Sequence, residues 1–76
     1  MALAFVCITT EPASMIEVLK KVKMVEGVQE AQLVYGVYDI VAKVEGETME
    51  ELKHTITHKI RRIDNVRTTV TMMVVK

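Results

Sequence analysis

One short stretch of the chain gathers its most distinctive side chains. Residues 34–46, VYGVYDIVAKVEG, contain both tyrosines, Tyr35 and Tyr38, together with Gly36 and Asp39. Small apolar residues surround the aspartate, and a carboxylate near a buried boundary is costly unless a cation or a donor pairs with it. The ammonium group of a ligand would be such a partner. Alternatively, Asp39 lies at the wet rim of a hairpin and bonds to backbone in the turn, as Asp often does.

Two histidines offer a second possible centre. His54 and His58 are four residues apart, a spacing that lets two imidazoles on a helix bind one metal ion. With Leu52 at the centre of the buried stripe, however, both project to the opposite, solvated side. Only Glu50 or Glu51 could add a ligand. We interpret the two histidines as surface side chains and predict no metal site.

Motifs of the common catalytic classes do not occur in the sequence. There is no GxxxxGK[ST], no GxGxxG and no CxxC. The segment TTEP after the first apolar run has neither the glycine nor the arginine of an acylphosphatase-type phosphate loop. Asp39 has no neighbouring carboxylate or histidine to complete an acid–base pair. We therefore predict that the protein is not an enzyme and uses no cofactor.

The composition restricts the class of protein and its partners. The 76 residues predict a single domain, 1–76, near the lower limit of unaided folding. Ten basic and ten acidic residues cancel, and the basic run at 59–62, KIRR, suits a helix end, so direct nucleic-acid binding is not expected. The apolar start, MALAFVCI, is too short to span a membrane. We expect a cytoplasmic protein in which Cys7 is a buried thiol.

The first half of the chain predicts a strand and a helix. The uninterrupted apolar run at 2–8 is typical of a strand covered on both faces. Thr10 is expected to cap the helix, which should end at Gly27. The apolar positions at helical spacing are Met15, Val18, Leu19 and Val22.

The second half predicts a hairpin, a helix and a last strand. Residues 28–35 and 37–45 have the composition of two strands, broken by Gly36 into a tight antiparallel hairpin. Thr48 and Glu51 form a capping box at the start of the second helix, and residues 66–75 predict the fourth strand. The apolar side of this helix contains Met49, Leu52, Ile56, Ile60 and Ile63.

The β-α-β-β-α-β order is that of the ferredoxin-like α+β fold, with a four-stranded antiparallel sheet in the order 4-1-3-2 and both helices on one face. The first and last strands are nevertheless apolar on both faces. At about 25 cal/mol per Å², leaving the second face wet would forgo several kcal/mol, so we predict that a second copy covers it. The alternative is that these runs reflect strand propensity alone. One side of the first strand carries Leu3, Phe5 and Cys7 and the other Ala2, Ala4, Val6 and Ile8; in the last strand, one side carries Val70, Met72 and Val74 and the other Thr71, Met73 and Val75.

The element order, the hairpin Gly36-x-x-Asp39 with its apolar strand, and the segment 63–70 containing Arg67-Thr68-Thr69 resemble the effector-binding (RAM) domain of the Lrp/AsnC, or feast/famine, regulators. The resemblance covers essentially the whole chain. It departs from full regulators in having no N-terminal helix-turn-helix domain, and so looks like a stand-alone RAM protein. The resemblance implies sheet-packed dimers in a dimeric α+β barrel arrangement, assembly into octamers or decamers, and binding of an amino acid between dimers.

The same resemblance implies roles for particular residues. Gly36 would allow close backbone approach to the ligand, and Asp39 would accept a hydrogen bond from its ammonium group. The tyrosines and Val37 would shape the hairpin wall, although Tyr35 and Tyr38 could equally pack at the edge of the core with wet hydroxyls. The implied ligand-binding positions are Tyr35, Gly36, Val37, Tyr38, Asp39, Thr68 and Thr69.

Three functions remain open at this point. The first is an amino-acid sensor that modulates full-length Lrp/AsnC regulators through mixed assembly. The second is a dimeric α+β barrel enzyme, which would need a polar group inside the barrel. The third is a structural partner subunit without ligand, for which Asp39→Ala would leave assembly unchanged.

Overall fold

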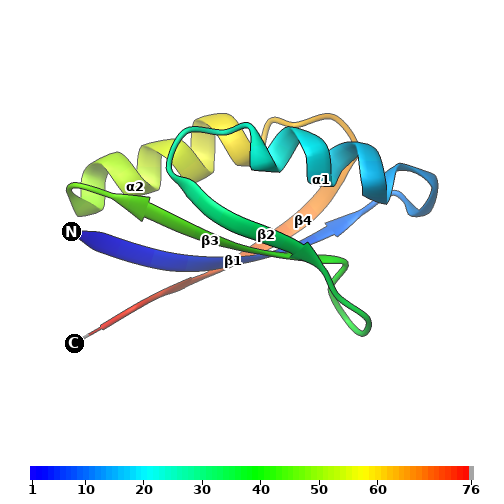
Figure 1. The fold of residues 1–76 in the computed structure, drawn as a ribbon, viewed down its shortest axis with the longest axis horizontal. Coiled ribbons are helices and arrows are strands. Elements are labelled where there is room, and N and C mark those ends of the chain that lie inside the picture. Colours follow the sequence, from blue (N-terminus) through cyan, green and yellow to red (C-terminus); the bar gives the residue numbers. More distant parts are fainter. Residues whose placement is uncertain (76) are drawn as a thin grey trace.

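A computed structural model describes residues 1–75, which form one sheet with helices on a single face (Figure 1). The strands are β1 (Ala2–Thr10), β2 (Val28–Leu33), β3 (Ile40–Gly46) and β4 (Val66–Met73), and the helices are α1 (Met15–Lys23) and α2 (Met49–Thr55), with short turns η1 (Pro12–Ser14) and η2 (Ile56–Ile60). The sheet order is β2-β3-β1-β4, entirely antiparallel. The predicted ferredoxin-like order, read from the other edge, is confirmed.

The central strand β1 has one face buried under the helices and one face that no element among residues 1–75 covers, and both faces are apolar. Ala4, Val6 and Ile8 are completely buried under the helices. On the other side, which we call the open face, Leu3 and Phe5 are only half-buried. Alternation of side chains along a strand therefore divides one apolar segment between a core and an uncovered surface.

The helix α1 begins and ends differently from the prediction. Thr10 does not cap it; Thr10 is still part of β1, where it pairs with Val66 after a register shift. The short η1 turn starts after Glu11, and α1 then runs only to Lys23. Gly27 lies further on in the turn before β2, at φ +102°, a conformation that L side chains rarely adopt.

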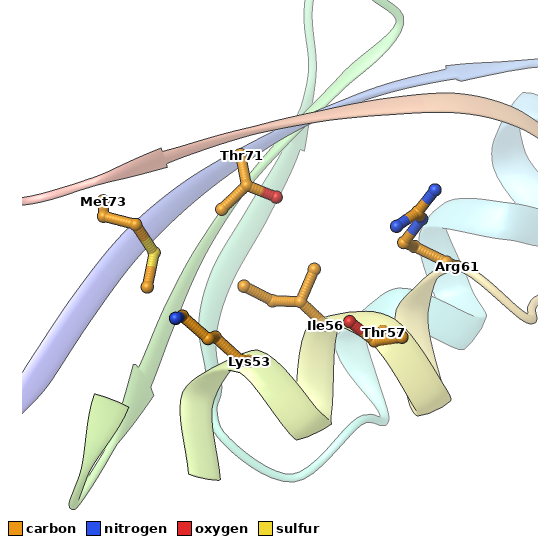
Figure 2. A pocket seen from close by; sticks show the side chains of 6 residues that line it. All are labelled: Lys53, Ile56, Thr57, Arg61, Thr71 and Met73. Carbon is orange, nitrogen blue, oxygen red and sulfur yellow. The ribbon is translucent and has the colours of Figure 1, made fainter. Parts of the chain in front are cut away.

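The helix α2 begins where the sequence predicts. The hydroxyl of Thr48 accepts a hydrogen bond from the backbone N–H of Glu51 at 3.0 Å, which confirms the cap. After Thr55 the helix widens into the π turn η2, closed by a bond of 3.0 Å from the N–H of Arg61 to the carbonyl of Ile56. A groove between this turn and β4 is shown in Figure 2.

The connection between β2 and β3 is longer than the predicted tight hairpin. Leu33 pairs with Ile40, and this is the last pair before the chain turns. Residues 34–39 therefore form a loop, closed by a bond of 2.9 Å from the N–H of Val34 to the carbonyl of Asp39. We call residues 34–39 the tip loop. In Figure 1 it extends beyond the end of the sheet as the green loop at the lower right. The strands alone therefore do not hold its side chains in the core.

The last strand is also shorter than 66–75, since β4 ends at Met73. Its pairing with β1 places Val70 opposite Cys7 and Met72 opposite Phe5, on the open face. Within the part of the chain described, no helix is long and apolar enough to cross a membrane.

Candidate functional site

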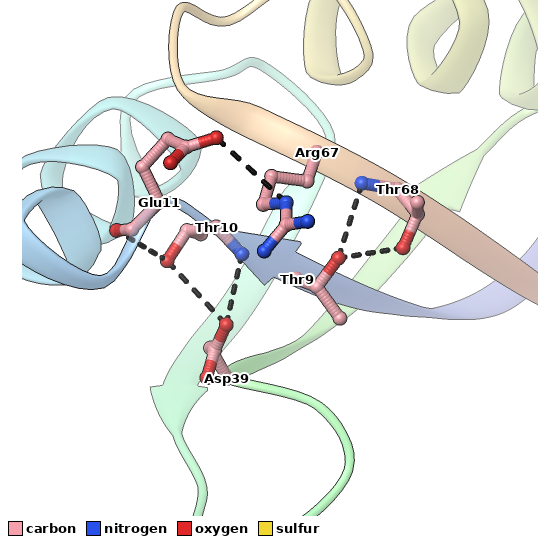
Figure 3. Close-up of polar contacts among 6 residues, drawn as sticks. All are labelled: Thr9, Thr10, Glu11, Asp39, Arg67 and Thr68. Atoms are coloured by element: carbon pink, nitrogen blue, oxygen red, sulfur yellow. Dashed lines mark hydrogen bonds and ion pairs between the residues drawn. The ribbon is translucent and has the colours of Figure 1, made fainter.

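Asp39 is fixed at the end of β1 rather than in its own turn. Its Oδ2 accepts a hydrogen bond of 2.8 Å from the backbone N–H of Thr10 and a longer one of 3.5 Å from the Thr10 hydroxyl (Figure 3). The N–H of Asp39 in turn donates to the carbonyl of Ile8 at 2.9 Å. Asp39 thus supplies the acceptor that β3 no longer offers where the two strands separate.

The two oxygens of this carboxylate differ in their hydrogen bonds. Among residues 1–75, both hydrogen bonds to the Asp39 side chain end on Oδ2 and none on Oδ1. The side chain is half-buried. A carboxylate that is held through one oxygen by a backbone N–H and a hydroxyl can accept a further hydrogen bond from an ammonium group on its other oxygen.

The tip loop presents apolar side chains to solvent. Tyr35 is fully exposed and Val37 is 84% exposed, whereas Tyr38 is half-buried. Gly36 has φ +146° and stands in open space. Edge-of-core packing therefore does not describe Tyr35 within a single chain. A tyrosine and a valine this exposed are typical of a surface that contacts another molecule.

The two predicted threonines point to opposite sides of the sheet. Thr68 lies opposite Thr9 on the open face, and their hydroxyls are 2.6 Å apart, while the Thr68 N–H donates to the same Thr9 oxygen at 3.1 Å. Thr69 lies opposite Ile8, whose side chain is in the core under the helices. Of the pair, only Thr68 contacts the side chains at the end of β1. We call this group the β1 end cluster (Thr9, Thr10, Glu11, Asp39, Arg67 and Thr68).

Thr9, Thr10 and Arg67 belong to this cluster although they are not among the predicted ligand-binding positions. Arg67 lies 3.7 Å from Glu11, measured between Nε and Oε2, with both side chains more than half exposed. An ion pair this exposed adds little to stability, so another anion could displace Glu11 from the guanidinium at little cost. The strand order could have revealed Thr10, because an antiparallel β1–β3 pair brings the end of β1 to the start of β3.

The two histidines lie next to each other on the surface. Their ring centroids are 4.5 Å apart and both side chains are exposed. No group of three or more His, Cys, Asp or Glu side chains among residues 1–75 could hold a metal ion. Cys7, by contrast, is buried as predicted, between its strand partners Val41 and Val70.

The open face combines an apolar half with a polar half. Val70 and Met72 remain 43% and 50% exposed, next to Leu3 and Phe5 of β1. Toward β2 the face becomes polar, as Lys43 and Glu45 of β3 lie opposite Phe5 and Leu3. A contiguous apolar half of this kind is typical of an interface rather than of a wet surface.

A comparison with protein families matches residues 3–76 to the model described as the Lrp/AsnC ligand binding domain. An uncharacterized HTH-type transcriptional regulator of Pyrococcus furiosus is 37% identical over 73 residues, which cover 92% of this chain and 49% of the regulator. The chain thus spans about half the length of this relative. Homocitrate synthase of Sulfolobus acidocaldarius is 36% identical over 59 residues, or 78% of this chain, but only 12% of that enzyme.

Solved structures agree with the sequence matches. The crystal structure of FFRP-DM1 has a TM-score of 0.94 and 37% identity, covering 99% of this chain and 100% of that one. AsnC of Escherichia coli has a TM-score of 0.90 and 29% identity, and covers 99% of this chain and 51% of AsnC. The structural matches and the sequence matches therefore identify the same family of proteins.

Proposed function

Because this chain belongs to the Lrp/AsnC ligand-binding domain family, we propose that it is a regulatory domain that binds an amino acid at the β1 end cluster and the tip loop. It acts in the cytoplasm and transmits the bound state to full-length Lrp/AsnC regulators by assembling with them. The observation that carries the proposal is the Asp39 carboxylate, which the Thr10 N–H holds in place through Oδ2 while no residue among 1–75 bonds to Oδ1.

Opposite charges at one end of the sheet suit a zwitterion. The ammonium group binds Oδ1 of Asp39, and the carboxylate binds Arg67, whose guanidinium lies in the same cluster (Figure 3). Gly36 has no side chain to block a ligand that approaches the loop backbone. The side chains of Tyr35, Val37 and Tyr38 form the wall, and Thr68, which bonds to Thr9 in the same cluster, adds a hydroxyl. Thr69 faces the helix side of the sheet and is left out of this site.

The site is completed by oligomerisation. The open face pairs with that of a second copy, and dimers assemble further into an octamer or decamer in which tip loops lie at the boundaries between dimers. The exposure of Tyr35 and Val37 supports this arrangement, since a loop that meets a neighbour needs apolar side chains outside its own core. A relative that is named as a transcriptional regulator supports a binding role more than it supports the barrel-enzyme alternative.

A thermal-shift screen of the twenty L-amino acids tests the proposal. A ligand at about 100 times its dissociation constant adds about 2.7 kcal/mol, which corresponds to roughly 10 °C or more for a domain of this size. The N-acetyl derivative of the best amino acid is the matched control, because it keeps the side chain and carboxylate but has no ammonium group. No shift with any amino acid at millimolar concentration, or an equal shift with the N-acetyl derivative, would refute the proposal.

Asp39→Asn separates the two roles of this residue. The amide oxygen can still accept from the Thr10 N–H, so the strand end stays closed, but the negative charge that attracts an ammonium group is gone. We expect the unliganded melting temperature to change little and the amino-acid shift to fall to a small fraction of the original. A full ligand response in this variant would show that Asp39 does not bind the ligand.

A further inference from the structure

A groove on the helix side of the sheet is separate from the tip loop and the β1 end cluster. It lies between the second helix and the edge strand β4 and has a volume of about 280 Å³. In Figure 2, side chains from the helix and from the strand face each other across it. Its lining residues are Lys53, Ile56, Thr57, Arg61, Thr71 and Met73.

The charged groups of this lining are all cationic. Lys53 and Arg61 are its ionisable side chains, and neither forms an ion pair within 4.0 Å with any residue that the structure describes. The whole stretch 52–63 contains no Asp or Glu, although acidic and basic residues balance over the chain. The groove therefore has a positive local potential in a neutral molecule, which favours an anion.

The helix presents these donors as one row. Lys53, Thr57 and Arg61 follow at intervals of four residues, and side chains four apart lie on the same side of a helix. Thr71 completes the row from β4, where its pairing with Val6 places it on the helix side. In Figure 2 the hydroxyl of Thr71 points along the strand toward Arg61.

The π turn is an independent sign that this part of the helix has a function. It is closed by the bond from the Arg61 N–H to the Ile56 carbonyl, and Ile56, Thr57 and Arg61 all line the groove. Turns of this kind are rare and occur frequently at functional sites. Here the wider turn keeps Ile56 buried while Arg61 stays at the mouth of the groove.

We infer that this groove binds a small organic anion with a carboxylate or phosphate head group and an apolar body. Arg61 and Lys53 hold the head group, with hydrogen bonds donated by the hydroxyls of Thr57 and Thr71. The apolar body packs against Ile56 and Met73. The site is independent of the amino-acid site proposed above, so the chain would respond to two chemically different ligands.

Calorimetric titration of the unmodified chain with pentanoate, butyl phosphate and inorganic phosphate, at low salt, tests the inference. We expect saturable binding of butyl phosphate or pentanoate, and the tighter of the two identifies the head group. Inorganic phosphate should bind more weakly, because it has no apolar part for Ile56 and Met73. If none of the probes saturates at millimolar concentration, or inorganic phosphate binds as tightly as butyl phosphate, the inference is wrong.

Charge-neutral variants locate the site. Arg61→Gln and Lys53→Gln should each weaken binding about tenfold or more, since each removes a charge-assisted contact. Arg62→Gln is the matched control, as Arg62 is adjacent, exposed and outside the lining. Equal weakening by Arg62→Gln would mean a diffuse charge effect and no groove site. Arg61→Gln should leave any amino-acid melting shift unchanged, so the two proposals can fail separately.

Discussion

At the scale of single residues, the molecule uses one carboxylate to close a strand end. Asp39 is the last residue of the tip loop and accepts a hydrogen bond from Thr10, a residue 29 positions earlier in the chain. An unpaired backbone N–H in a partly buried position is costly, so the side chain replaces a missing strand partner. Any ligand at Oδ1 therefore contacts a group that also connects β1 to the loop.

Replacing Asp39 by alanine should destabilise the fold. The Thr10 N–H loses its acceptor, which costs about 1–2 kcal/mol, while Asp39→Asn, with its amide oxygen, should cost well under half as much. Urea unfolding of both variants measures the difference. Equal midpoints for Asp39→Ala and the unmodified chain would show that water replaces the carboxylate without loss.

Two glycines with positive φ make a matched pair for backbone strain. A Cβ at Gly27 would lie 2.9 Å from the carbonyl oxygen of Glu45, whereas a Cβ at Gly36 would meet nothing within 4 Å. Both alanine variants pay for the unfavourable conformation, about 1 kcal/mol or more, but only Gly27→Ala adds a clash with backbone. Thermal unfolding should therefore show the larger loss for Gly27→Ala, and the reverse order would contradict this geometry.

At the scale of elements, the second helix depends on its first turn. Thr48 caps α2, and the Glu51 carboxylate accepts a hydrogen bond of 3.4 Å from the N–H of Glu47. Because α2 packs on β3 and β1, fraying of this turn would loosen the centre of the sheet. At its other end the helix continues into the π turn η2, so Thr48 caps the end at which α2 has ordinary helical geometry.

Thr48→Ala should lower stability by about 1 kcal/mol, the usual cost of losing a side-chain cap. Thr48→Ser keeps the hydroxyl and should retain most of the stability. Urea midpoints of the two variants make the comparison. A serine variant as unstable as the alanine variant would mean that the methyl group, and not the hydroxyl, is the source of the effect.

The sequence predicts which elements exist better than where they end. The β-α-β-β-α-β order and the Thr48 cap follow from periodicity and capping residues, and the sheet order is the usual one of the ferredoxin-like fold that this element order indicates. The tip loop was missed because Val34, Tyr35 and Val37 have strand propensity, yet pairing across the sheet stops at Leu33. Register between distant strands decides such ends, and local propensity contains no information about it.

The spacing of the apolar residues in the second helix already indicates a π turn. Leu52, Ile56 and Ile60 recur every four residues, and each such step overshoots a 3.6-residue turn by about 40°. A wider turn absorbs this excess and lets Leu52, Ile56 and Ile60 all remain buried. The assignment of the ligand-binding residues, by contrast, depends on neighbours that a single chain does not contain, and it stays a prediction.

At the scale of the whole molecule, the open face and the tip loop are two different surfaces. The open face is broad and apolar on its β1–β4 half, with Val70 and Met72 about half exposed. The tip loop is narrow and lies at the end of the sheet. The first suits a dimer of sheets, and the second suits contacts between dimers, so an assembly with two kinds of interface fits this chain.

Val70→Lys should convert the proposed dimer to monomers, because it places a charge on the apolar half opposite Cys7. Thr71→Lys is the matched control on the same strand, since Thr71 faces the helix side and is exposed there. Light scattering coupled to gel filtration measures the mass of each variant. A monomeric unmodified chain, or equal dissociation by both variants, would contradict a dimer formed through the open face.

The antiparallel pairing of β1 with β4 has a practical consequence. It brings Ala4 beside Met73, so both ends of the described chain leave the sheet on one side, as Figure 1 shows. The tip loop lies on the other side, beyond the nine residues of β1, or about 25–30 Å away. A fluorophore or an immobilisation handle fused at either terminus would therefore stand clear of Asp39.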